Sequence, residues 1–215
     1  MWSSVKDKEY YTASRPEIME FIPDDIKTIL EVGCGEGNFG YNLKNKLNAE
    51  VWGIELNPES AKIAKDKLNN VLHGDINLLL PNIPDNYFDC IVFNDVLEHL
   101  VDPVLTLKNI KSKLSKNGAI ISSIPNMRYI TVLSDLVINK DWYYTDSGIL
   151  DSTHLRFFTK KSIIRMFEEL DYKVVTIKGI SSTNSLKFYL WNLLSLGLFL
   201  DSKYRQFACV AKQKH

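Results

Sequence analysis

Between residues 28 and 125 the chain alternates short runs of β-branched and other apolar residues with segments of helical periodicity. Each apolar run is too short for a typical buried helix and has the composition of a buried strand. The runs are Thr28–Val32, Val51–Ile54, Val71–His73, Phe88–Phe93 and Ala119–Ile124. Strict alternation of strand and helix predicts right-handed crossovers and an α/β fold, in which helices cover both faces of a mostly parallel sheet.

Helix starts between these runs are marked by a capping residue followed by proline. Asn57-Pro58 precedes a helix that we expect over Glu59–Leu68, and Asp102-Pro103 precedes one over Val104–Leu114. The capping side chain can accept hydrogen bonds from free helix N–H groups, and proline suits the first helical position because it has no N–H to satisfy.

Length and composition narrow the class of protein. The chain of 215 residues suits one domain with a sizeable core, so we expect residues 1–215 to form a single domain. Because 26 basic residues balance 26 acidic ones, no global positive field attracts nucleic acid, and we expect no nucleic-acid partner. Cys34, Cys90 and Cys209 form no CxxC pair, so neither a disulfide framework nor a zinc site is expected. The absence of a signal-peptide core and of a long apolar window favours a cytoplasmic location.

The pattern changes after Ile124. Residues 126–158 are rich in aromatic residues, have weak periodicity and follow the carboxyl end of a strand, which suits a substrate lid. Two more strands, Lys173–Ile180 and Gln206–Ala211, complete a sheet of seven and are expected to form an antiparallel pair at its end.

Residues 181–202, between these last two strands, form an apolar helical insertion. At 100° per residue, its polar residues fall on one side of a helix and leave a wide arc of leucine and aromatic side chains. Three interpretations stay open at this point: packing into the core, a seam between two copies in a homodimer, and a peripheral membrane contact.

A glycine-rich loop over Gly33–Gly37 directly follows the first expected strand, which carries the acidic residue Glu31. Glycine allows a backbone turn with positive φ and lets a ligand approach closely, at the edge where open α/β sheets bind ligands. We therefore expect a cofactor site that includes Glu31, Gly33, Cys34, Gly35 and Gly37. Cys34 is expected to be a buried apolar residue close to the cofactor rather than a nucleophile.

Acidic residues also follow the next two strands. Glu55, which stands 22 residues after Gly33 and just before Leu56, can accept both hydroxyls of a ribose, although a solvated strand-end acid is the alternative. Asp75, just before Ile76, can accept from an adenine amine, cap the next helix, or do both.

Several consecutive segments resemble a known family. The segments ILEVGCGEGNFG, VWGIELNPESAKIAKDKL, HGDI, FDCIVFNDVLEHLVDP and LSKNGAIISSIPN, over roughly residues 28–125, resemble the class I S-adenosylmethionine-dependent methyltransferases. Within that family they are similar to the group with ubiquinone-pathway O-methyltransferases and glycan-cluster methyltransferases. The resemblance implies a Rossmann-like fold and S-adenosylmethionine as the cofactor.

The resemblance also implies roles for single residues. The three loop glycines would line the methionine moiety, Glu55 would hold the ribose, Asp75 and Ile76 would flank the adenine, and Asn94 would face the methyl donor. Glu9–Glu17, within an N-terminal arm of residues 1–27, resembles the arm that folds over the cofactor in relatives. Arg15 would then pair with the cofactor's carboxylate, although an ordinary surface arginine is the alternative.

His154 is the predicted catalytic base on the acceptor side. It lies in Asp151–Thr159, which resembles a segment of glycan-cluster relatives, and the other histidines are terminal, on a strand or at a helix edge. A pKa near 6.5 leaves imidazole mostly free to accept a proton at neutral pH. A structural histidine bonded within the lid is the alternative.

A metal site is not expected. Asp95, Glu98 and His99 have the spacing of one helical face. One short helix supplies too few groups for a hard cation, which needs several converging oxygens.

The sequence therefore predicts an enzyme that moves a methyl group from S-adenosylmethionine to a small molecule or sugar, most simply to an oxygen atom. An N-methyltransferase acting on an amino sugar or other small molecule, and a non-catalytic cofactor-binding regulatory protein, remain as alternatives. A nicotinamide-dependent oxidoreductase would prefer GxGxxG, which Gly33–Gly37 does not match.

Overall fold

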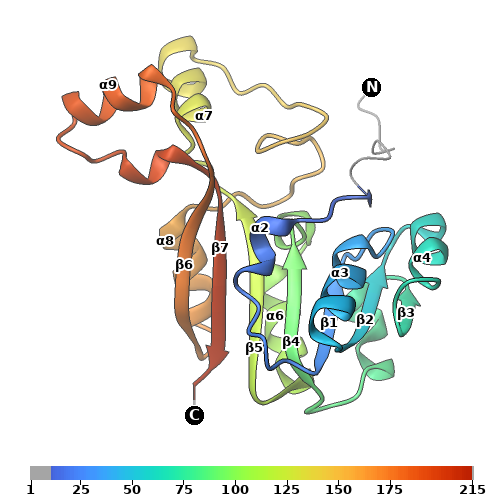
Figure 1. The fold of residues 1–215 in the computed structure, drawn as a ribbon. Coiled ribbons are helices and arrows are strands. Elements are labelled where there is room, and N and C mark those ends of the chain that lie inside the picture. The colour runs from blue at the N-terminus through green and yellow to red at the C-terminus, as the bar shows by residue number, and fades with distance from the viewer. Residues whose placement is uncertain (1–10, 215) are drawn as a thin grey trace.

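The computed structural model describes residues 11–214, and its centre is a seven-stranded sheet in the order β3-β2-β1-β4-β5-β7-β6 (Figure 1). The strands are β1 (Thr28–Val32), β2 (Glu50–Glu55), β3 (Asn70–His73), β4 (Phe88–Asn94), β5 (Leu114–Pro125), β6 (Tyr172–Ser182) and β7 (Tyr204–Gln213). Strands β1 to β5 pair in parallel, whereas β7 runs antiparallel to both β5 and β6. The predicted α/β fold with an antiparallel last pair is confirmed.

A hydrophobic core lies on each face of the sheet. Neighbouring residues of a strand point to opposite faces, so Ile29 of β1 joins one core and Leu30 the other. Helices whose residues join the first core are α2 (Pro16–Met19), α3 (Asn38–Leu47) and α4 (Pro58–Ala64). Helices whose residues join the second are α5 (Ile76–Leu79), α6 (Pro103–Ile110) and α8 (Lys160–Glu168).

Helix ends differ from the sequence expectation more than helix starts do. Helix α4 ends at Ala64 rather than Leu68, and α6 ends at Ile110 rather than Leu114. A 3₁₀ turn over Lys111–Lys113 follows α6, and Leu114 already belongs to β5. Leu114 keeps the helical spacing of four from Ile110, so periodicity alone does not reveal where helix gives way to strand. Both predicted caps are confirmed, because the side chains of Asn57 and Asp102 accept hydrogen bonds from helix N–H groups.

Strand order reverses beside β1. The chain runs from β1 through β2 to β3 on one side, then returns to β4 on the other side of β1. Such a switch point leaves a crevice outside the carboxyl ends of the strands, where open α/β proteins bind ligands. The glycine loop, Glu55 and Asn94 all stand at these strand ends.

Two segments extend beyond this edge of the sheet (Figure 1). After β5 come α7 (Ile130–Ser134), a π-helical turn (Asp135–Asn139) and a long loop, and between β6 and β7 come α9 (Leu186–Leu194) and a 3₁₀ turn (Leu200–Lys203). The interpretation that residues 181–202 pack into the core is wrong, because most leucines of α9 and the following turn are exposed. Across residues 11–214, no helix has both the length and the apolar character needed to cross a bilayer.

Candidate functional site

The glycine loop has the backbone that its sequence predicts. Gly33, Gly35 and Gly37 adopt φ values of 73°, 54° and 77°, a region that side chains with a Cβ rarely enter. The N–H groups of Gly33 and Cys34 donate to the carbonyl of Ile54 in β2, at 2.8 and 3.0 Å, which holds the loop against the next strand. A Cβ built on Gly35 would approach the carbonyl oxygen of Tyr11 to 2.5 Å. The N-terminal arm therefore lies directly on the loop.

Glu55 braces this loop from the end of β2. Its carboxylate accepts from the N–H of Gly35 at 2.7 Å and from the N–H of Asn57 at 2.8 Å, and the residue is buried. Sequence reasoning predicted a ribose ligand and missed this bracing role. A carboxylate has about four acceptor positions, so two N–H partners leave capacity for ribose hydroxyls.

Glu31 is a buried carboxyl beneath the loop. Burial raises its pKa to about 8, and the charge of Glu55 adds to the rise, while a hydrogen bond from the backbone of Gly40 opposes it. Its Oε2 atom has no hydrogen-bond partner among the described residues. Burial also raises the pKa of the Cys34 thiol, which agrees with its predicted role as an apolar residue rather than a nucleophile.

Asn94, at the end of β4, supports the fit of a polar cofactor. Neither its Nδ2 nor its Oδ1 has a hydrogen-bond partner among the described residues, although both atoms are buried. Unpaired buried polar atoms are costly and rare in folded proteins. This amide offers both a donor and an acceptor at the end of β4, which pairs with the strand that precedes the glycine loop, so the residues present fit the polar amino acid part of S-adenosylmethionine.

The residues predicted to bind the cofactor beyond Glu55 lie partly at the surface and partly in the core. The carboxylate of Asp75 accepts from the N–H of Asn77 at 2.7 Å, which confirms its role as a helix cap. Ile76 is buried in the core, so it could face a ligand only through its backbone. Leu56 is 68% exposed and offers an apolar side chain at the rim. Contact of Asp75 and Ile76 with adenine, and of Leu56 with the cofactor, stays a prediction.

Arg15 lies within an ion-pair network at the ends of β4, β5 and β7. Its guanidinium contacts Asp95 at 2.8 Å, Ser123 Oγ at 2.9 Å and Gln206 Oε1 at 3.0 Å. Gln206 Nε2 donates in turn to Asp95 at 2.7 Å. The surface alternative is wrong, because the side chain of Arg15 is 18% exposed. Pairing with a cofactor carboxylate stays a prediction, and residues 1–10 of the arm lie outside the described residues.

Sequence reasoning missed this network because its members are far apart in the chain. Asp95 was considered only as a metal ligand, Ser123 lies in a family-like segment but was given no role, and Gln206 was predicted only as the start of a strand. The positive φ of Asp95, 53°, turns the chain sharply after β4. Its carboxylate therefore accepts from Ser123 and Gln206 instead of joining Glu98 and His99.

His154 lies against two residues of the segment after β4. Its Nδ1 donates to the carbonyl of Ile149 at 2.9 Å, which leaves Nε2 as the basic nitrogen, 4.0 Å from Glu98 Oε1. Its ring also packs edge-on against His99, with centroids 4.6 Å apart. Burial, together with the charge of Asp95, raises the pKa of Glu98 well above its usual range. Because His154 is 8% exposed and bonded within the lid, the structural alternative has direct support.

This cluster differs from the helical face considered from the sequence. The segment Leu97–His99 is a single 3₁₀ turn, and the third group near Glu98 and His99 is His154 rather than Asp95. One potential ligand atom of each lies within 4.8 Å of the others. Two imidazoles and a carboxylate are a set that transition metals accept, so sequence spacing underestimated what the fold brings together here.

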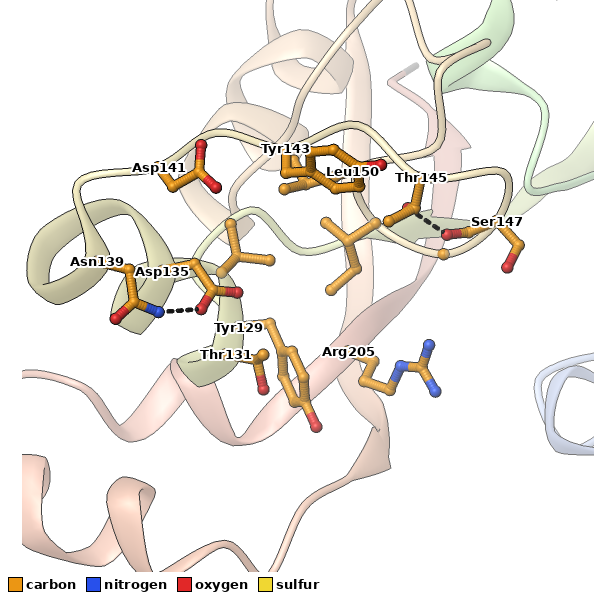
Figure 2. Close-up of a pocket in the computed structure, with 13 residues that line it drawn as sticks. Tyr129, Thr131, Asp135, Asn139, Asp141, Tyr143, Thr145, Ser147, Leu150 and Arg205 are labelled. Carbon is orange, nitrogen blue, oxygen red and sulfur yellow. Dashed lines mark hydrogen bonds between the residues drawn. The ribbon is translucent and has the colours of Figure 1, made fainter. Parts of the chain in front are cut away.

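A cavity of about 450 Å³ lies beyond the ends of β5 and β7 (Figure 2). Figure 2 shows Tyr129 and Arg205 on one side of it, and Tyr143 and Thr145 of the long loop on the other. The π-helical turn contributes Asp135 and Asn139, which hydrogen-bond to each other at 2.9 Å. The predicted lid thus forms most of the wall of a cavity with aromatic, cationic and anionic groups.

Comparison with known proteins finds relatives over most of the chain. Residues 6–177 match the family model described as Methyltransferase domain. The chain is similar to a ubiquinone biosynthesis O-methyltransferase of Nitrosospira multiformis, with 26% identity over 83% of this chain and 74% of that protein.

Solved structures agree with the fold. A SAM-dependent methyltransferase from Archaeoglobus fulgidus has a TM-score of 0.68 and 21% identity, over 96% of this chain and 97% of that chain. A protein from Thermotoga maritima described as a possible histamine N-methyltransferase has a TM-score of 0.65 and 16% identity, over 96% and 91%. At these identities the two structures show a shared fold.

Proposed function

This chain belongs to the methyltransferase domain family, and we propose that it transfers the methyl group of S-adenosylmethionine to an oxygen atom of a small molecule or sugar. The observation that carries the proposal is the arrangement along one edge of the sheet. There the glycine loop, the Glu55 carboxylate and the unpaired amide of Asn94 stand at the ends of β1, β2 and β4. The similarity to an O-methyltransferase supports oxygen as the acceptor atom.

Residues of this edge would bind and orient the donor. The glycine loop allows close approach, Glu55 accepts from the ribose, and Asn94 supplies an amide to the amino acid part. When bound, S-adenosylmethionine supplies a methyl group made electrophilic by its positive sulfur. The protein then contributes mainly alignment and exclusion of water.

The cavity beside the lid is the proposed acceptor site. Tyr129 and Tyr143 offer surfaces on which a sugar or aromatic ring can stack, and Asp135 can accept from hydroxyl groups. The guanidinium of Arg205 makes no ion pair with a described residue, so it is available for an anionic group of the acceptor. Ile149 also lines the cavity, and its carbonyl accepts from His154.

His154 is the proposed base for a hydroxyl acceptor. Its Nδ1–H is fixed on a carbonyl, so Nε2, which lies 4.0 Å from Glu98 Oε1, is the nitrogen that takes the proton. Because the ring is buried, this role requires that the lid move when the acceptor binds. His154→Asn keeps a hydrogen-bonding group of smaller size and should lower turnover by roughly 10²- to 10⁴-fold without weakening donor binding.

Calorimetry and product analysis test the proposal together. The protein should bind S-adenosylhomocysteine, and Glu55→Ala should weaken that binding because ribose hydroxyls lose a charged acceptor. Incubation of isotopically labelled S-adenosylmethionine with pools of hydroxylated and amino acceptors, followed by mass spectrometry, identifies the methylated atom. Binding of NAD without any binding of S-adenosylhomocysteine would refute S-adenosylmethionine as the cofactor. A labelled methyl group on a nitrogen atom of the product would show N-methylation in place of the proposed O-methylation.

A further inference from the structure

An exposed apolar protrusion lies between β6 and β7. We call residues 186–200 the apolar tip; it comprises α9 and the turn after it (Figure 1). Seven of its leucines are each more than half exposed: Leu186, Leu190, Leu193, Leu194, Leu196, Leu198 and Leu200. Leu196 is 96% exposed, close to the value of an isolated side chain. Soluble monomers rarely expose a continuous apolar surface of this kind without a function.

Helix α9 is apolar on its outer side as well as at the buried Phe188. Its polar Asn192 points inward and donates to the carbonyl oxygens of Phe188 at 2.9 Å and Phe199 at 3.3 Å. Leu193 and Leu194, directly after it, point outward with 75% and 76% exposure. A helix facing water would show the opposite pattern. The outer side of α9 is therefore mainly apolar.

Side-chain contacts fix the conformation of the apolar tip. Trp191 and Phe199 pack edge-on with ring centroids 5.2 Å apart. Arg128, which follows β5, donates to the carbonyl of Leu198 at 3.0 Å and pairs with Asp201 at 2.7 Å. Because these contacts are specific, the leucines are presented by a fixed scaffold rather than left over from a loose loop.

Charge around the tip favours an anionic partner. Lys187 is the only charged residue from position 186 to position 200. Asp201, just beyond, is neutralised by Arg128, and Lys203 follows it. At the same end of the molecule, the π-helical turn exposes Val137 and Ile138, by 60% each (Figure 1). Because Asp135 begins this turn and Lys140 and Asp141 follow it, the turn adds apolar surface but no net positive charge. Apolar residues bordered by lysines complement the acyl chains and anionic headgroups of a bilayer surface.

We propose that the apolar tip inserts into the headgroup region of an anionic lipid bilayer and docks the protein on its surface. Nine residues of α9 span less than half of a bilayer core, so the contact is interfacial. The exposed leucines occupy both the helix and the turn after it, on a segment that projects from the sheet (Figure 1). A projecting, convex surface suits insertion into lipid, whereas a stable pair of copies needs a broad, self-complementary face.

Vesicle sedimentation with the full chain tests this proposal. The vesicles contain phosphatidylcholine with or without phosphatidylglycerol. The tip variant is Leu193→Glu with Leu194→Glu, and the control is Val104→Glu with Leu105→Glu, which adds the same charge at exposed positions of α6. The protein and the control should sediment with phosphatidylglycerol vesicles equally, and the tip variant should bind at least about tenfold more weakly.

Two further measurements separate the remaining outcomes. Leu196→Ser with Leu198→Ser removes apolar area without adding charge and should also weaken binding, while circular dichroism confirms that all variants are folded. Light scattering reports whether two copies associate through the tip. The proposal is refuted if the unaltered protein does not sediment with vesicles, or if the tip variant and the α6 control lose binding equally. It is also refuted if the unaltered protein forms a dimer that does not bind lipid and that only the tip substitutions dissociate.

Discussion

The buried carboxyl of Glu31 predicts a stability that falls as the pH rises. Its pKa is raised to about 8 in the folded protein, chiefly by burial, and is near 4.5 in the unfolded chain. Between these values the folded state holds one proton more than the unfolded state. Raising the pH therefore favours unfolding, and the contribution is fully present below pH 4.5 and lost as the pH passes 8. Integrated from pH 6 to pH 9, this loss is about 3 kcal/mol.

Glu31→Gln removes the titration while keeping the shape of the side chain. At pH 6 the variant should lie within about 1 kcal/mol of the unaltered protein, because a neutral amide replaces a neutral acid. From pH 6 to pH 9 it should gain about 3 kcal/mol relative to the unaltered protein, whose carboxyl must ionise. Urea unfolding at pH 6, 7, 8 and 9 gives the difference in free energy of unfolding, in which the other titrating groups cancel.

Glu50→Gln is the matched control. Hydrogen bonds from Trp52 and Tyr87 lower the pKa of Glu50, so this residue is ionised in both states across that pH range. Its effect on the free energy of unfolding should therefore not depend on pH. For Glu31→Gln, the difference in free energy of unfolding from the unaltered protein should change with pH. If that difference changed by less than about 1 kcal/mol from pH 6 to pH 9, the conclusion that Glu31 is protonated at neutral pH would be wrong.

Two other predictions concern the arm and the loop beneath it. Gly35→Ala should lower affinity for S-adenosylhomocysteine by at least about tenfold in calorimetry, because its Cβ would meet the Tyr11 carbonyl at 2.5 Å. Gly197→Ala also has a positive φ, but its Cβ would meet only Leu200, at 3.6 Å, so it should leave affinity unchanged. Equal affinities for the two variants would contradict the close approach at Gly35. Arg15→Gln should destabilise the protein by about 2 kcal/mol in urea unfolding, since Asp95 loses its cation in a partly buried site. Lys178→Gln breaks an exposed pair and should cost less than about 0.5 kcal/mol, so similar losses for the two variants would rule out a special role for the Arg15 network.

Local rules explain why the donor half of the site could be predicted from the sequence. A glycine loop after a buried strand, and an acid at the end of the next strand, are brought together by the geometry of one βαβ unit. The structure places them as expected, with the N–H of Gly35 at 2.7 Å from Glu55. Helix ends were less predictable, because Leu114 satisfies the period of α6 and the composition of β5 at once.

Contacts between distant parts of the chain explain what the sequence could not reveal. Arg15 and Gln206 are separated by 191 positions yet hydrogen-bond at 3.0 Å, and no motif connects them. The same holds for Glu98 and His154, whose proximity depends on how the segment after β5 folds back over β4. Both contacts lie near the ends of the middle strands, at the edge of the sheet that carries the glycine loop. The arm contacts the glycine loop, and the segment after β5 lines the proposed acceptor cavity. In our proposal, acceptor selection therefore depends on contacts between distant parts of the chain, about which local sequence rules carry least information.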